Sequence, residues 1–136
     1  MTISRLCIRG GFLLEDTMSM RADVGITMTK YASDRFNAEL AAADPETQSA
    51  VAALKASAGF TSENKSGDLL FIWEDVCWDP DCFVHRFVCN MADNGHEAEV
   101  CLIRIGEDLD EMIDIIGEMD ANPFEMGVVR KLVYKA

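Results

Sequence analysis

Residues 68–106, which read DLLFIWEDVCWDPDCFVHRFVCNMADNGHEAEVCLIRIG, decide the fold that we predict for this chain. They include four of the five cysteines, both histidines and both tryptophans. The DPD sequence at 79–81 is typical of a turn with proline at its second position. The NG pair at 94–95 is a strong β-hairpin signal. Apolar stretches separated by these two turns predict a three-stranded antiparallel meander.

The two turns also determine a register for this meander. The first turn sets Trp78 opposite Phe83, and the second sets His85 opposite Arg104. Because side chains alternate between the two faces of a strand, one face becomes an apolar core. The other face mixes charged residues with apolar ones, which are Phe71, Trp73, Val84, Val88, Cys101, Ile103 and Ile105. We expect N-terminal elements, or a second copy of the chain in a homo-oligomer, to cover this mixed face.

The N-terminal residues predict further β-structure. Residues 3–15 fit a β-hairpin that turns at two adjacent glycines and pairs Ile8 with Leu13. A single strand that is kinked at the glycines is the alternative. Residues 24–29 contain enough β-forming side chains for another short strand.

Two helices are predicted before the meander. The first begins at Thr29 or Ser33, either of which would cap it, and reaches about residue 42. The second begins at the DPE sequence 44–46, which combines an aspartate cap with proline in the first turn. It ends near Gly59.

Residues 107–119 carry the most regular helical pattern of the chain, with apolar side chains three and four positions apart behind an acidic start. Residues 127–134 predict a last strand. The polar linker 61–67 separates residues 1–60 from residues 68–136 within what we predict to be a single domain. The expected fold class is α+β, with an antiparallel sheet of roughly four to six strands and about three helices packed on it.

Composition and charge exclude several classes of protein. The chain has 24 acidic and 12 basic residues and a net charge of −12. Direct binding of nucleic acid needs clustered basic residues for the phosphates, so we do not expect it. No apolar run approaches the ~18 residues of a membrane span, so we expect no membrane partner. The N-terminal residues lack a signal peptide, which predicts a cytoplasmic protein with reduced thiols.

The acidic residues are concentrated in one part of the chain. Residues 68–125 contain sixteen of them and only two arginines. An acidic surface often serves only solubility, but it also attracts and orients basic partners. We expect a negative surface that binds a basic protein, for example as an inhibitor or DNA mimic acting on a nucleic-acid-binding protein. The surface would consist of Asp79, Asp81, Asp93, Glu97, Glu99, Asp110, Asp114 and Glu118.

Four potential zinc ligands lie within thirteen positions: Cys77, Cys82, His85 and Cys89. The predicted register argues against a shared metal ion, because it places the first two on the mixed face and the last two on the core face. His85 and Cys89 would also stand roughly 13 Å apart along one strand, too far for a catalytic pair. Cys77 and Cys82 would be diagonal neighbours, which disfavours a redox-active disulfide between them. We predict no metal and no cofactor.

Glu74, His85 and Arg104 are polar residues on the predicted core face. A glutamate that holds a histidine beside an arginine would perform acid–base chemistry on an anionic substrate. An ion network at the rim of the core explains the same residues more simply, because buried charges must pair. The chain also lacks a glycine-rich phosphate loop and the common hydrolase motifs. We therefore predict a small non-catalytic interaction protein, with a small-ligand-binding or catalytic domain that uses these three residues as the alternative.

Overall fold

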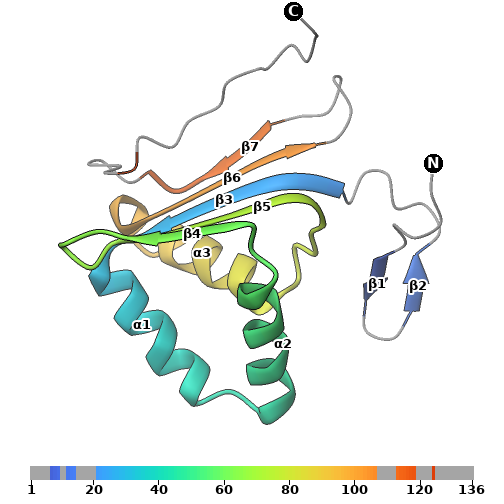
Figure 1. The fold of residues 1–136 in the computed structure, drawn as a ribbon. Coiled ribbons are helices and arrows are strands. Elements are labelled where there is room, and N and C mark those ends of the chain that lie inside the picture. The colour runs from blue at the N-terminus through green and yellow to red at the C-terminus, as the bar shows by residue number, and fades with distance from the viewer. Residues whose placement is uncertain (1–6, 10–11, 15–20, 107–112, 119–123, 125–136) are drawn as a thin grey trace, which may run out of the picture.

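A computed structural model of the chain describes residues 7–9, 12–14, 21–106, 113–118 and 124. Within these residues the main sheet has five antiparallel strands in the order β4-β5-β3-β6-β7. Three α-helices of the described chain lie against one face of this sheet (Figure 1). The predicted α+β class, an antiparallel sheet with helices packed on it, is confirmed.

Strand β3 (Arg21–Met28) lies at the centre of the sheet. It pairs antiparallel with β5 (Leu69–Cys77) on one side and with β6 (Val100–Gly106) on the other. Pairing on both sides satisfies its backbone, and its helix-facing side chains are almost completely buried. The short strand predicted at 24–29 is therefore part of the longer strand on which the sheet is built.

The two edges of the sheet are the strands that the sequence pattern did not predict. β4 (Phe60–Glu63) overlaps the predicted linker 61–67, because exposed edge strands tolerate polar side chains. β7 (Ile113–Ile116) lies in the predicted helix 107–119, and the helix prediction is wrong for these four residues. Three isoleucines in this short run favour a strand, and β7 pairs antiparallel with β6.

The first two helices begin where their capping residues predict. α1 (Lys30–Ala41) follows Thr29, whose hydroxyl accepts a hydrogen bond from the first turn. α2 (Pro45–Ala56) follows Asp44, whose carboxylate accepts the N–H of Thr47 at 2.7 Å. Hydrogen bonds from the side chain and the backbone of Thr47 lower the pKa of Asp44. The described helices have at most twelve residues, and none of them is long and apolar enough to cross a membrane.

Helix α3 (Phe83–Asp93) replaces the middle strand of the predicted meander, and the strand prediction is wrong there. Its apolar residues also recur at helical spacing. Those buried against the sheet are Val84, Phe87, Val88 and Met91. The NG pair at 94–95 ends this helix instead of turning a hairpin, with Gly95 at a φ of 86°. The same two residues suit both roles, because each role needs positive φ.

The helix also changes which residues share a face. Without the middle strand, the predicted pairings of Trp78 with Phe83 and of His85 with Arg104 do not form. The predicted mixed face is divided between two layers. Its members between the sheet and the helices are Phe71, Trp73, Val84 and Val88. Its members on the opposite face of the sheet are Cys101, Ile103 and Ile105. Whether a second copy covers that opposite face stays a prediction.

The backbone pairing of the predicted N-terminal hairpin is confirmed for residues 7–9 and 12–14. β1 (Cys7–Arg9) pairs with β2 (Phe12–Leu14) in a separate two-stranded sheet, and Ile8 stands opposite Leu13 as predicted. The kinked single strand is therefore excluded. The strand predicted at 127–134 lies outside the described residues.

Two glycine-to-alanine substitutions test the placement of β7. Gly117 has a φ of 80°, and a Cβ atom there would lie 2.5 Å from the carbonyl oxygen of Val100. Gly95 has a φ of 86°, but a Cβ atom there would meet nothing within 4 Å. We expect Gly95→Ala to lower the free energy of unfolding by about 1–2 kcal/mol through backbone strain alone. Gly117→Ala should cost a further ~1–3 kcal/mol because of the close contact.

Urea unfolding of the two variants measures this difference. Alanine in place of glycine inside a helix would stabilise the chain by up to about 1 kcal/mol. A gain in stability for Gly117→Ala, or equal losses in the two variants, would therefore contradict the position of β7 beside β6.

Candidate ligand-binding pocket

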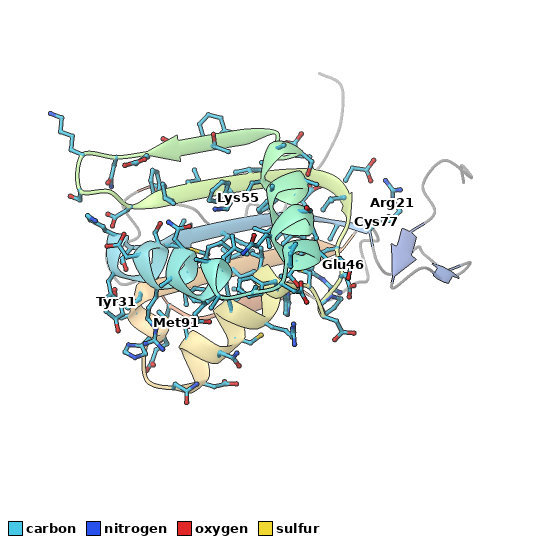
Figure 2. The ribbon with its side chains drawn as sticks, turned by 90° about the horizontal axis from the view of Figure 1, so that it is seen from below. Arg21, Tyr31, Glu46, Lys55, Cys77 and Met91 are labelled. Atoms are coloured by element: carbon cyan, nitrogen blue, oxygen red, sulfur yellow. The ribbon has the colours of Figure 1, made fainter. Side chains whose placement is uncertain are left out.

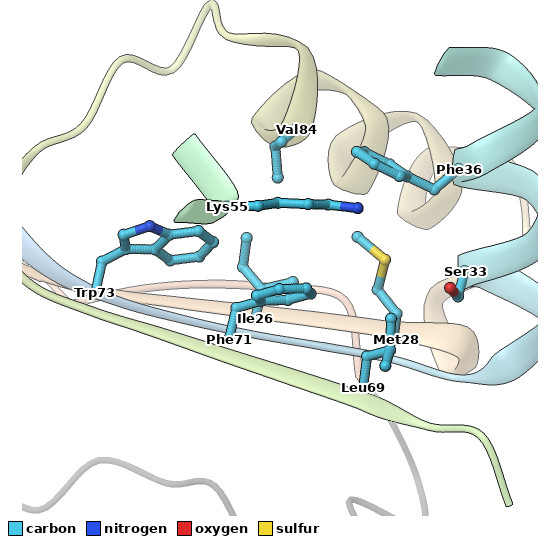
Figure 3. Close-up of a pocket in the computed structure, with 9 residues that line it drawn as sticks. All are labelled: Ile26, Met28, Ser33, Phe36, Lys55, Leu69, Phe71, Trp73 and Val84. Carbon is cyan, nitrogen blue, oxygen red and sulfur yellow. The ribbon is translucent and has the colours of Figure 1, made fainter. Parts of the chain in front are cut away.

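A pocket lies between the sheet and the helices (Figure 3). Its lining residues are Ile26, Met28, Ser33, Phe36, Lys55, Leu69, Phe71, Trp73 and Val84. They come from β3, β5 and all three described helices. All of them except Ser33 and Lys55 are apolar. The empty space within the lining is about 320 Å³ when the mouth is included.

The floor of the pocket follows from strand geometry. Residues two positions apart on a strand point to the same face, so Leu69, Phe71 and Trp73 of β5 all face the helices. The register sets Ile26 opposite Phe71 and Met28 opposite Leu69, which places these side chains of β3 beside those of β5. Two neighbouring strands thus present one continuous apolar floor.

Phe36 of α1 forms one wall of the pocket and is only 2% exposed. Its ring packs edge-to-face against Phe83 and Phe87 of α3, with centroids 5.4 Å and 5.1 Å away. Such T-shaped contacts are the favourable geometry for aromatic pairs. This wall is therefore held in place by the contact between two helices.

Trp73 joins the floor to α2. Its indole N–H donates a hydrogen bond of 2.9 Å to the backbone carbonyl of Leu54. Its ring stacks on Phe71 at a centroid distance of 5.8 Å and lies 5.3 Å from the ring of Trp78. Because Trp73 is 2% exposed, this hydrogen bond satisfies a buried donor and fixes α2 over the sheet.

Lys55 is the one charged residue among the described residues of the lining. It extends from α2 across the pocket (Figure 3), and its Nζ lies 4.8 Å from the centroid of Phe36 and 5.7 Å from that of Phe71. Burial lowers the pKa of this amine. With the side chain in this position, the pocket has room for about one water molecule.

The sequence contains a signal for Lys55, although none of the predicted sites includes this residue. Val51 is an apolar residue near the middle of α2, and it is 3% exposed. Lys55 follows it by four residues, so the two side chains share one face of the helix. A lysine on the core side of an alanine-rich helix is the anomaly that identifies this position.

Glu74 does not share a face of the sheet with the other two members of the predicted trio, His85 and Arg104. Glu74 is exposed on β5, one position after Trp73 and on the opposite face. Arg104 lies on β6 and pairs with Val24 on the far side of β3. His85 lies on α3, where its Nδ1 accepts a hydrogen bond of 2.9 Å from the indole N–H of Trp78.

The four cysteine and histidine residues do not form a metal centre. Cys77 is disulfide-bonded, so reduced thiols were the wrong expectation for it, whereas Cys82 and Cys89 are free thiols. The Cys77 disulfide therefore does not involve Cys82. Burial raises the pKa of both Cys82 and Cys89, which disfavours the thiolates that zinc binds. Within the described ranges, no group of three or more ligating side chains converges on a metal position.

The predicted acidic surface is divided by α3. Asp79 and Asp81 precede this helix, whereas Asp93 and Glu97 lie at its other end. Because α3 has eleven residues, the two groups are separated by ~16 Å. Glu99 lies near the second group, and Glu118 joins it through a hydrogen bond of 2.6 Å from its backbone N–H to the Glu97 carbonyl. Asp114 lies on β7 opposite Arg104, and Asp110 lies outside the described residues.

A polar groove lies between α1 and the end of α3. Arg35 Nη1 donates to the hydroxyl of Tyr31 at 3.3 Å and lies 3.5 Å from His96 Nε2. The hydrogen bond to Tyr31 raises the pKa of Arg35. Glu39 lies 3.7 Å from Arg35 and balances its charge. The groove therefore offers an incoming anion no excess positive charge.

At the end of the sheet where β3 begins, Arg21 forms an ion pair with Asp75, near Cys77 (Figure 2). Asp75 has a φ of 53°, and its N–H donates to the carboxylate of Asp23 at 2.8 Å. The register between β3 and β5 shifts there. These contacts stabilise a β-bulge.

Comparison of the chain with protein-family models, with curated protein sequences and with solved structures found no match. A fold class does not determine a function, so any function must rest on the chemistry of the site. Fold and site together define an α+β domain with an apolar pocket whose described lining contains a single amine.

Lys55→Met tests the desolvation of the amine. Methionine keeps an unbranched side chain in the pocket but removes the charge. Since burial lowers the pKa of Lys55 in the folded protein, the unfolded chain binds more protons between that lowered pKa and the ordinary value of 10.5. The stability of the native protein relative to the variant should therefore rise with pH through this interval. The rise should stay below about 1 kcal/mol, because solvent reaches the half-buried amine.

Denaturant unfolding of both proteins at neutral pH and near pH 10.5 measures the change. Other titrating groups are common to the two proteins and cancel in the difference. A relative stability that falls, or stays constant, as the pH rises would contradict the desolvation of Lys55.

Proposed function

We propose that this protein is a small-ligand-binding domain and that its ligand occupies the pocket crossed by Lys55. The proposal rests on the chemistry of the lining, in which apolar side chains from four elements surround two polar side chains, Ser33 and Lys55. Sites for small molecules are typically apolar concavities with a few placed polar groups. With Lys55 across it the pocket has room for about one water molecule, and the space between its walls is about 320 Å³ with open solvent included, so the ligand is small.

A ligand must displace the side chain of Lys55, because this side chain crosses the pocket. Lysine has a flexible four-carbon stem, so it can turn outward without moving the backbone. The walls, in contrast, are held by the ring contacts of Phe36 and by the hydrogen bond from Trp73 to α2. Fixed walls and one movable side chain allow the pocket to open without rearrangement of the sheet.

This function belongs to the ligand-binding alternative predicted from the sequence, but it uses a different site from Glu74, His85 and Arg104. It requires no catalytic group. An acidic surface that binds a basic partner stays a prediction, and so does a cytoplasmic location. The separation of the described carboxylates by α3 is the reason that we place the function in the pocket.

Titration with octanol, followed by amide NMR, tests the proposal. Octanol is uncharged and small, so it probes the apolar pocket alone. We expect saturable shifts at the lining residues of β3 and β5. Unfolding followed in parallel should show a midpoint temperature that rises with octanol concentration, since a ligand that binds only the native state stabilises it.

A matched pair of variants on β5 locates the binding. Leu69 lines the pocket and Ile72 lies on the opposite face of the same strand, and both are partly buried. Leu69→Trp should fill the pocket and abolish the octanol shifts, whereas Ile72→Trp should retain them. Shifts confined to the opposite face, or equal binding by the two variants, would exclude the pocket as the site.

A further inference from the structure

Among the residues that the structure describes, the amine of Lys55 has no acidic partner. The chain contains 24 carboxylate side chains. Lys30 pairs with Asp34 at 3.0 Å, and Arg35 lies 3.7 Å from Glu39. For Lys55, the described residues provide no ion pair. Desolvation lowers its pKa, and no carboxylate of the described part of the chain offsets this effect.

Two aromatic rings are the partners that the amine does have. Its Nζ lies over Phe36 at 4.8 Å and near Phe71 at 5.7 Å. The electron-rich face of a ring attracts a cation, but it carries no net charge. The positive charge of Lys55 is therefore only partly compensated in the pocket.

Ser33 of α1 supplies a second polar atom. Its hydroxyl lies on the side of the pocket toward which the Lys55 amine extends (Figure 3). Among the described residues this hydroxyl has no hydrogen-bond partner. A hydroxyl is both a donor and an acceptor, so it can donate to a ligand oxygen. An amine and a hydroxyl from facing helices thus border one apolar space.

On the basis of the proposed function, we propose that the ligand is a small amphipathic carboxylate, whose apolar chain fills the pocket and whose carboxylate binds the Lys55 amine and the Ser33 hydroxyl. The carboxylate brings the one negative charge that the amine lacks, and its two oxygens match the two polar groups. A phosphate dianion would bring a second negative charge that the lining does not balance. A neutral head group would leave the amine uncompensated.

The stem of Lys55 and the chain of the ligand compete for the same space. When the ligand enters, the stem moves outward and the amine remains paired with the carboxylate. Charge-assisted hydrogen bonds of this kind are stronger than neutral ones. Binding therefore replaces a cation that faces two rings with an ion pair.

Comparison of octanoate with octanol tests this inference, because the two molecules share a chain length and differ in charge. Octanol is more apolar than octanoate, so a pocket that does not recognise the carboxylate would bind octanol more tightly. We expect the native protein to bind octanoate at least about tenfold more tightly than octanol. Lys55→Gln should remove this preference, and Ser33→Ala should reduce it about threefold. The control is Lys65→Gln, which changes the net charge by the same amount as Lys55→Gln at an exposed loop residue. This variant should keep the preference for octanoate.

The outcomes separate the inference from the proposed function. If octanol binds the pocket and octanoate binds no more tightly, the carboxylate is excluded while the ligand-binding function stands. A preference that persists in Lys55→Gln, or that Lys65→Gln also removes, excludes the role of Lys55. Failure of both molecules to shift the lining residues overturns the function and the inference together. Amide spectra of each free variant establish that it is folded.

Discussion

The pairing of β3 on both of its sides is the constraint on which the rest of the structure depends. Seven residues of this strand pair with β5 and seven pair with β6. Because β3 pairs on both sides, it has no unpaired backbone edge. Its apolar side chains can then be buried only by elements that pack on a face of the sheet. Val24 and Ile26 are 1% and 0% exposed under the helices. The helices are needed because they cover these apolar side chains of the central strand.

The same constraint directs the chain into α1. β3 ends at Met28, and the backbone N–H of Thr29 donates to the carbonyl of Glu99 at 3.0 Å, just before β6. The hydroxyl of Thr29 then caps α1. One residue therefore ends the pairing of the sheet and begins the helix that carries Ser33 and Phe36 to the pocket.

The pocket follows from how the aromatic side chains share the space above the sheet. Phe36 packs against α3, and Trp73 is bound to the backbone of α2. Each contact holds a helix in place, and the gap that remains is filled by the stem of a lysine. A leucine at position 55 would complete an ordinary core. The charge at this point is the feature that core packing does not require, and the proposed ligand site rests on it.

The elements that the sequence predicted well are those whose signals are local. The cap residues of α1 and α2, and the register of the N-terminal hairpin, depend on side chains a few positions apart. α3 was missed because its apolar residues fit both a strand and a helix, and an NG pair serves a hairpin and a helix end equally. The pocket was missed because its residues are distributed from 26 to 84 in the chain.

The sequence by itself determined the α+β class, two of the helices, the strands at the centre of the sheet and the excess of negative charge. Only the tertiary structure decided that residues 83–93 form a helix and that residues 113–116 form an edge strand. These choices depend on which surface each segment meets, because α3 covers the sheet and β7 completes its edge. Only the tertiary structure also placed the amine of Lys55 between Phe36 and Phe71, since no spacing along the chain relates these three residues.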